Sequence, residues 1–169
     1  MPMSGKKRAF LGQYRHSVDE KGRVSIPADF RPLLLGERGS FFVNWGVERC
    51  VMAYPEDKWE QIVEMVNAVA IEDENTRWYK RAFFSGAREV SCDQQGRILI
   101  PPPLMEYARI TKEVVIVGVS DRVEIWDAET WDASLPQALN EYGKMTERMT
   151  HSSPPTKSRP EETTGGAGG

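Results

Sequence analysis

Short apolar runs bounded by turn-forming residues recur along most of the chain. Residues 24–26 and 98–100 are runs rich in β-branched side chains that follow a Gly-Arg pair and end at a proline, a pattern typical of short strands. Longer apolar runs predict a second hairpin in each half, at residues 41–43 with 50–54 and at 114–117 with 123–126. The two prolines, Pro27 and Pro101, should each stop a strand and start a short helix, over residues 28–34 and 102–108.

Longer helices are predicted where the apolar spacing changes to three and four residues. After Pro55, this spacing gives one apolar helix face to Trp59, Ile62, Val63, Val66 and Ala70. A second helix is expected over residues 74–85, and a third begins near Ala128. Pro136 lies inside the third helix and should kink or break it, because proline lacks a backbone N–H and clashes with the preceding turn.

The chain contains two copies of one pattern. Residues 12–27 align with residues 86–101 at a constant offset of 74. Identical positions include Gly12, Asp19, Gly22, Arg23, Ile26 and Pro27 in the first copy, which fall on Gly86, Asp93, Gly96, Arg97, Ile100 and Pro101 in the second. The match resumes at an offset of 72, where residues 43–46 meet residues 115–118. Duplication of one supersecondary unit is the simplest explanation.

Each copy carries the motif Asp-x-x-Gly-Arg, which is typical of a tight hairpin turn. The aspartates can cap the turns and the glycines can take the positive φ of a tight reversal, which assigns a structural role to Asp19, Gly22, Asp93 and Gly96. An arginine projecting from such a turn can bind phosphate oxygens or the edge of a guanine. Alternatively, Arg23 and Arg97 pair only with the aspartates of their own turns. The spacing leaves both interpretations open.

Charge is unevenly distributed along the chain. The composition is 40% hydrophobic and 28% charged, as in ordinary globular proteins. The net charge of −3 and the pI of about 5.5 argue against a nucleic-acid partner. However, residues 1–23 hold six basic and two acidic residues, a net charge of +4, and the remainder carries −7. A basic end on an acidic body can still attract DNA locally.

Several classes of protein are excluded by what the sequence does not contain. No apolar run approaches the roughly 20 residues that cross a bilayer, and no signal-peptide core is present, so we expect a cytoplasmic protein without a membrane partner. Phosphate-loop, dinucleotide, zinc-helix and nucleophile-elbow patterns are missing, so we expect no enzyme, no cofactor and no small-molecule substrate. Cys50 and Cys92 lie in apolar stretches without zinc spacing and should be small buried residues, so no metal site is expected.

Four stretches of sequence carry a family signature. They are Phe-Leu-Gly-x-x-x-x-x-Val-Asp-x-Lys-Gly-Arg-Val-Ser-Ile-Pro at residues 10–27, Asp-x-x-Gly-Arg-Ile-Leu-Ile at 93–100, Leu-x-x-x-Ala-x-Ile-Thr-Lys-Glu-Val at 104–114 and Glu-Ile-Trp-Asp at 124–127. A single Asp-x-Lys-Gly-Arg motif carries little information, but two such turns at this separation, followed by the Trp-Asp ending, are specific. Together they resemble the MraZ family over residues 10–147.

The resemblance implies a fold and a function. The implied fold is α+β and β-dominated: two tandem SpoVT-AbrB-type repeats form a pseudo-twofold, swapped-hairpin, AbrB-like β-barrel with flanking helices. The implied protein is a nucleoid-associated transcriptional regulator that assembles into a ring-shaped homo-oligomer. It binds direct repeats of double-stranded DNA in the promoter of its own division and cell-wall gene cluster. The family's basic, turn-centred DNA-binding surface corresponds here to Lys21, Arg23 and Arg97, with Arg15 as a weaker candidate.

The repeats and their flanks predict five segments. They are a basic N-terminal extension (1–9), a first SpoVT-AbrB-like repeat (10–70), a connecting helix (71–85), a second repeat (86–149) and a disordered tail (150–169). The basic residues of the extension either touch DNA as a flexible arm or play no part in binding, and we prefer the second interpretation.

One departure from the repeat bears on function. The second turn has Gln95 where the first has Lys21, so it offers one cation fewer and Arg97 should contribute less. The main alternative function is an AbrB-like barrel that serves as a protein or peptide interaction module. The basic residues around positions 19–23 favour DNA, because phosphate binding requires them and a peptide groove does not.

Overall fold

A computed structural model describes residues 8–152, which contain eight strands and five helices. The contacts divide the chain between Ala133 and Ser134 into two compact units. In chain order the elements are β1 (Gln13–Ser17), β2 (Arg23–Ser25), α1 (Arg31–Leu35), β3 (Phe41–Trp45), β4 (Val51–Tyr54), α2 (Glu56–Asn67), α3 (Glu74–Gly86), β5 (Arg88–Val90), β6 (Arg97–Leu99), α4 (Pro102–Tyr107), β7 (Glu113–Val119), β8 (Arg122–Asp127) and α5 (Ala128–His151). The predicted α+β class is therefore confirmed.

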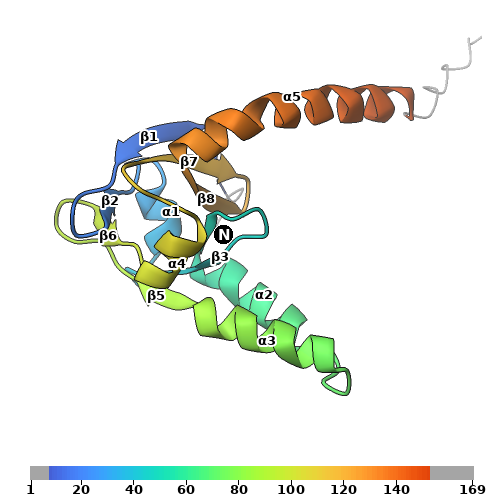
Figure 1. Ribbon diagram of the computed structural model, residues 1–169, viewed down its shortest axis with the longest axis horizontal. Coiled ribbons are helices and arrows are strands. Elements are labelled where there is room, and N and C mark those ends of the chain that lie inside the picture. The colour runs from blue at the N-terminus through green and yellow to red at the C-terminus, as the bar shows by residue number, and fades with distance from the viewer. Residues whose placement is uncertain (1–7, 153–169) are drawn as a thin grey trace, which may run out of the picture. The chain divides into compact units, whose positions relative to one another are not determined.

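The strands form two antiparallel sheets in which the repeats exchange partners. The larger sheet has six strands in the order β1-β7-β8-β4-β3-β5, and β2 pairs with β6 in a separate ribbon (Figure 1). The first strand of each repeat pairs with the third strand of the other repeat, since β1 lies on β7 and β5 lies on β3. The two repeats are therefore interleaved.

The strand register relates the two repeats by an approximate twofold arrangement. At the centre of the larger sheet, β4 pairs with β8 so that Met52 lies opposite Glu124, its counterpart at the offset of 72. In the ribbon, Val24 lies opposite Ile98, its counterpart at the offset of 74. Equivalent residues of the two repeats therefore face each other across the centre of each sheet.

The expected closed β-barrel is wrong, because the larger sheet remains open. Its two edge strands are β1 and β5, which do not pair with each other. The strands that follow them, β2 and β6, have only three residues each, and those residues pair with one another. No strand in residues 8–152 is thus left to join the two edges of the sheet.

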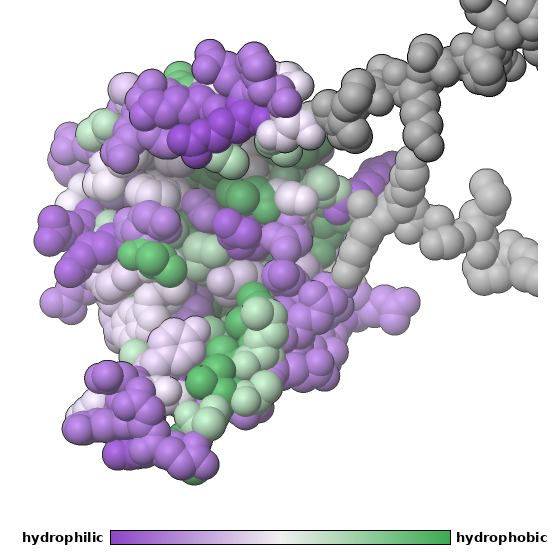
Figure 2. All heavy atoms as spheres, turned by 90° about the vertical axis from the view of Figure 1, so that its right-hand side faces the viewer, coloured by the Kyte–Doolittle hydropathy of each residue, from purple (hydrophilic) through white to green (hydrophobic). Residues whose placement is uncertain are grey.

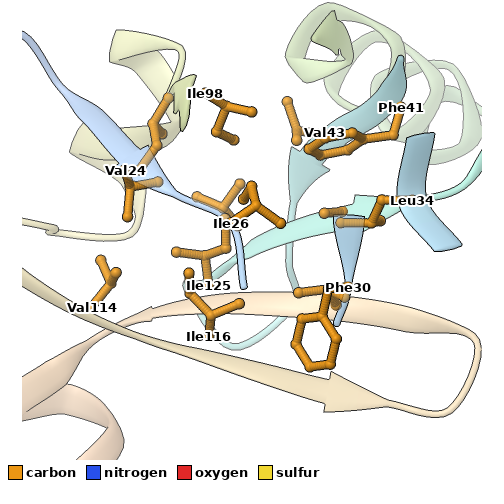
Figure 3. Close-up of a cluster of buried hydrophobic side chains, with 14 of the residues drawn as sticks. Val24, Ile26, Phe30, Leu34, Phe41, Val43, Ile98, Val114, Ile116 and Ile125 are labelled. Atoms are coloured by element: carbon orange, nitrogen blue, oxygen red, sulfur yellow. The ribbon is translucent and has the colours of Figure 1, made fainter. Parts of the chain in front are cut away.

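One hydrophobic core is shared by both repeats. Figure 3 shows side chains from the two halves converging between the ribbon and the larger sheet. The labelled members from the first repeat are Val24, Ile26, Phe30, Leu34, Phe41 and Val43, and those from the second are Ile98, Val114, Ile116 and Ile125; all are buried. A single repeat would leave this apolar face uncovered, so the two halves stabilise each other.

Most helices lie where the sequence places them, with two corrections. The helix predicted over residues 74–85 corresponds to α3, and the helix predicted from the apolar spacing after Pro55 corresponds to α2. The first short helix begins at Arg31 rather than at residue 28, because the N–H groups of Phe30 and Arg31 both bond the Pro27 carbonyl and close a turn first. Of the kink or break predicted at Pro136, the break is wrong, since α5 runs through this residue to His151. The two terminal segments, residues 1–7 and 153–169, lie outside the described residues.

Gly118 lies where β7 of the second repeat meets the segment that precedes β1 of the first. A substitution at this position therefore tests the contact between the two interleaved repeats. Its N–H donates to the Gly12 carbonyl at 2.8 Å, and a Cβ placed on it would lie 2.5 Å from the backbone of Phe10 and Leu11. We expect Gly118→Ala to lower the free energy of unfolding by about 1–3 kcal/mol, as overpacking against rigid backbone does. Urea denaturation followed by circular dichroism measures this change.

Gly143 provides the matched control, because it lies in α5 with nothing within 4 Å of an added Cβ. Gly143→Ala should leave stability unchanged or raise it by up to about 1 kcal/mol. Equal effects of the two substitutions would contradict the close approach at Gly118.

Candidate nucleic-acid interface

The first turn is closed by the carboxylate and the carbonyl of Asp19. Its Oδ1 accepts hydrogen bonds from the backbone N–H groups of Lys21 at 2.9 Å and Arg23 at 2.8 Å. Its carbonyl accepts the Gly22 N–H at 3.0 Å, and Gly22 has a φ of +82°. That conformation favours glycine, because a Cβ would clash with the neighbouring carbonyl. Asp19 and Gly22 thus set the shape of the loop.

The second turn repeats this geometry almost bond for bond. Asp93 Oδ1 accepts the backbone N–H groups of Gln95 and Arg97, each at 2.9 Å, and its carbonyl accepts that of Gly96 at 3.0 Å. Gly96 has a φ of +76°. The backbone hydrogen bond from the arginine is the largest influence that lowers the pKa of each aspartate, Asp19 and Asp93, below its usual value. Both carboxylates are therefore ionised at neutral pH.

The fold brings the two turns side by side. The Ile26 N–H donates to the Gly96 carbonyl at 2.9 Å, and the Ile100 N–H donates to the Gly22 carbonyl at 3.0 Å. These bonds extend the β2–β6 ribbon at both ends, so each strand finishes on the other repeat's turn (Figure 1). Arg97 Nη1 lies 3.8 Å from Asp19 Oδ2 of the other turn. Two motifs that are distant in sequence, one from each repeat, thus form one surface.

Each turn arginine is held by the aspartate of its own turn. Arg23 Nε donates to Asp19 Oδ2 at 2.7 Å, and Arg97 Nε donates to Asp93 Oδ2 at 2.9 Å. The pairing that the spacing left open is therefore present. It uses one of the five N–H groups of each guanidinium, and the side chains remain 33% and 26% exposed. The aspartates fix the direction of the guanidinium groups and leave other donors for an anion.

The remaining predicted cations differ in position. Lys21 is exposed at the tip of the first turn, and no side chain in residues 8–152 pairs with its ammonium group. Its counterpart Gln95 is exposed on the second turn. Arg15 lies on β1 and forms an ion pair with Asp132 in the first turns of α5. The structure thus brings Lys21, Arg23 and Arg97 together and directs Arg15 elsewhere.

Sequence reasoning missed two residues whose side chains lie against the turn glycines. A Cβ built on Gly96 would lie 2.8 Å from Cζ of Arg31, and one built on Gly22 would lie 3.5 Å from Sδ of Met105. Arg31 and Met105 are equivalent positions of the two repeats and lie in the short helices α1 and α4. Extending the repeat alignment beyond the prolines would have paired them, although it could not show that each contacts the other repeat's turn.

The described residues offer little support for other chemistry. Within residues 8–152, no group of His, Cys, Asp and Glu side chains could hold a metal ion. Cys50 is buried, as expected, and burial raises the pKa of its thiol to about 12, whereas Cys92 is only partly buried. No helix in this part of the chain has both the length and the apolar character to span a bilayer.

Comparisons with known proteins identify the family. Residues 9–82 and 83–152 each match the family model described as "MraZ protein, putative antitoxin-like". "Transcriptional regulator MraZ" of Carboxydothermus hydrogenoformans is 44% identical over 140 residues, which cover 83% of this chain and 96% of that protein. The proteins of the same name from Desulforamulus reducens and Pelotomaculum thermopropionicum are 41% and 44% identical over 140 residues, with 96% and 94% of their lengths covered.

The family is one of regulators rather than enzymes. Two matched repeats, the high identity and the nearly complete coverage of the relatives all agree with the duplicated turns and the interleaved sheets. The chain therefore belongs to the MraZ family of transcriptional regulators.

Proposed function

We propose that this chain is a sequence-specific DNA-binding regulator whose paired turns contact the duplex. The observation that carries the proposal is the joining of the two Asp-x-x-Gly-Arg turns by the β2–β6 ribbon, which presents Lys21, Arg23 and Arg97 on one surface. Its targets are direct repeats in the promoter of the organism's own division and cell-wall gene cluster. The protein acts in the cytoplasm, in association with the nucleoid.

The three cations would have different roles in binding. Lys21 is a mobile point charge suited to a phosphate oxygen. Arg23 and Arg97 are oriented by their aspartates, and an oriented guanidinium can bind two acceptors at the edge of a guanine. Phosphate contacts position a protein on DNA, whereas contacts to bases provide the sequence preference. The surface thus contains groups for both tasks.

The charge balance at the turns favours weak individual sites. Residues 19–23 contain two acidic and two basic residues, and residues 93–97 contain one of each. Neither turn has a net charge, so one subunit should bind DNA modestly. Several subunits that meet adjacent repeats would bind more tightly, because each bound site raises the effective concentration of the next. Self-assembly is therefore part of the proposal.

DNA binding is tested by fluorescence anisotropy with a labelled fragment of the division-cluster promoter and a scrambled duplex, each at two salt concentrations. Arg23→Ala should weaken promoter binding by about 1–3 kcal/mol and reduce the preference over the scramble. Lys21→Gln should weaken binding to both duplexes alike and make it less sensitive to salt, as the loss of a phosphate contact does.

The chain supplies the matched control for Lys21→Gln, because the second turn already has a glutamine at this position. Gln95→Lys adds the same charge to the equivalent site and should strengthen binding to both duplexes. If the assembled wild-type protein binds neither duplex, the DNA-binding proposal fails, and the interaction module becomes the better interpretation.

Assembly into a ring-shaped homo-oligomer is supported by two separate apolar surfaces. The first is a groove of about 490 Å³ on α2 and α3, where Met65 is 70% and Tyr79 is 54% exposed. Figure 2 shows it as a green strip in the lower half of the view, bordered by polar residues. The second lies on α5 and comprises Leu139, Tyr142, Met145 and Met149, all exposed. Two different surfaces suit head-to-tail contacts, which close into rings.

Charged substitutions should disrupt this assembly. Met65→Glu in the groove and Tyr142→Glu on α5 would place an unpaired carboxylate in an apolar contact, so each should shift the particle mass to smaller species. Size-exclusion chromatography with light scattering measures the mass. Val47→Glu is the matched control, because Val47 is 91% exposed outside both surfaces and should not change it. A wild-type protein that is monomeric at all concentrations would refute the ring.

We also propose boundaries for the segments. The first repeat comprises residues 10–70 and the second 86–149, and α3 is the core of a connecting segment over residues 71–85. Residues 1–9 form an extension that plays no part in DNA binding. The tail predicted from residue 150 overlaps the last two residues of α5, which ends at His151.

A further inference from the structure

Arg31 belongs to the first repeat, but its side chain lies on the turn of the second. It is the first residue of α1, and a Cβ added to Gly96 would lie 2.8 Å from its Cζ and 3.1 Å from its Cδ. Any side chain at position 96 would therefore displace the guanidinium. Burial is the larger influence on the pKa of the nearby Cys92 thiol and raises it. The positive charge of Arg31 acts in the opposite direction and lowers this pKa.

No acidic side chain within residues 8–152 forms an ion pair with Arg31. Its Nε is buried and has no hydrogen-bond partner there. The three arginines predicted from the sequence, Arg15, Arg23 and Arg97, each pair with an aspartate. A partly buried guanidinium without an anion is unfavourable, and this cost is offset when an anion binds. The guanidinium of Arg31 thus lies beside the second turn without an anionic partner among residues 8–152.

The equivalent position in the other repeat is apolar. Met105 lies in α4 with its N–H bonded to the Pro101 carbonyl, just as the Arg31 N–H bonds the Pro27 carbonyl, and it covers Gly22 of the first turn. At the tips of the turns the cation is in the first turn instead, which has lysine at position 21 where the second has glutamine at position 95. Each turn therefore has one cation besides its arginine. At the first turn this cation is Lys21 of the turn itself, and at the second turn it is Arg31 of the other repeat.

We propose that Arg31 binds a DNA phosphate at the second turn and takes the role that Lys21 has at the first. The proposal rests on the proposed DNA-binding function and adds a contact that neither the turn motif nor its spacing contains. The second turn is then complete only when the two repeats are interleaved, because its second cation comes from the first repeat. As a phosphate contact, Arg31 contributes to affinity and to salt dependence but not to sequence preference.

The test exchanges the two equivalent residues. Arg31→Met copies the arrangement at the first turn, and Met105→Arg places a cation over Gly22. Binding to the promoter duplex and to the scramble is measured across a series of salt concentrations. Arg31→Met should reduce the slope of log K against log salt by about 1 for each engaged subunit and weaken binding to both duplexes equally. Met105→Arg should increase that slope.

Arg81→Met is the matched control, because it removes an arginine charge from α3, which lies away from both turns (Figure 1). It should leave the slope unchanged. Circular dichroism and light scattering report whether each variant is folded and assembled. If Arg31→Met does not fold, Met105→Arg decides the question alone.

An unchanged slope in folded Arg31→Met, or in Met105→Arg when Arg31→Met does not fold, overturns the assignment of Arg31 and leaves the proposed function intact. A change in promoter binding without a change in scramble binding also overturns it, since a phosphate contact does not discriminate between sequences. If the wild-type protein binds no duplex, the proposed function fails and the assignment fails with it.

Discussion

The reciprocal hydrogen bonds between Ile26 and Gly96 and between Ile100 and Gly22 determine the arrangement around them. They attach the end of each short strand to the other repeat's turn, at a glycine whose positive φ shapes that turn. The proline that follows each strand then starts a helix beside the same turn. The pairing of the turns, the shared core beneath the ribbon and the position of Arg31 all depend on this exchange.

Interleaving also explains how such short elements are stable. Strands of three residues contribute few hydrogen bonds, and helices as short as α1 and α4 are marginal by themselves. Their stability comes from burial of residues such as Ile26 and Leu104 against the larger sheet. Because the sheet takes strands from both repeats, the core forms only when both halves are folded.

Local chemistry made much of the fold predictable. Asp, Gly and Arg at fixed spacing identified both turns, and the spacing of Trp59, Ile62 and Val66 identified α2. Long-range features were less accessible. The open sheet depends on which strands of one repeat find partners in the other, and neither the composition nor the motif determines that. The helix α5 continues through Pro136, although proline is the least favourable residue in a helix interior. The role of Arg31 could not be predicted from the motif, because the turn that its side chain contacts lies in the other repeat.

Fusion of the two repeats into one chain allows their equivalent positions to diverge. In a dimer of identical single repeats, the residues over the two turn glycines would necessarily be the same, and so would the residues at the turn tips. Here Arg31 stands against Met105 and Lys21 against Gln95, so the paired turns have lost their symmetry although the backbone retains it. The two ends of the proposed DNA-binding surface therefore differ. We expect it to dock on a duplex in a preferred direction, which fits the proposed direct repeats better than inverted ones.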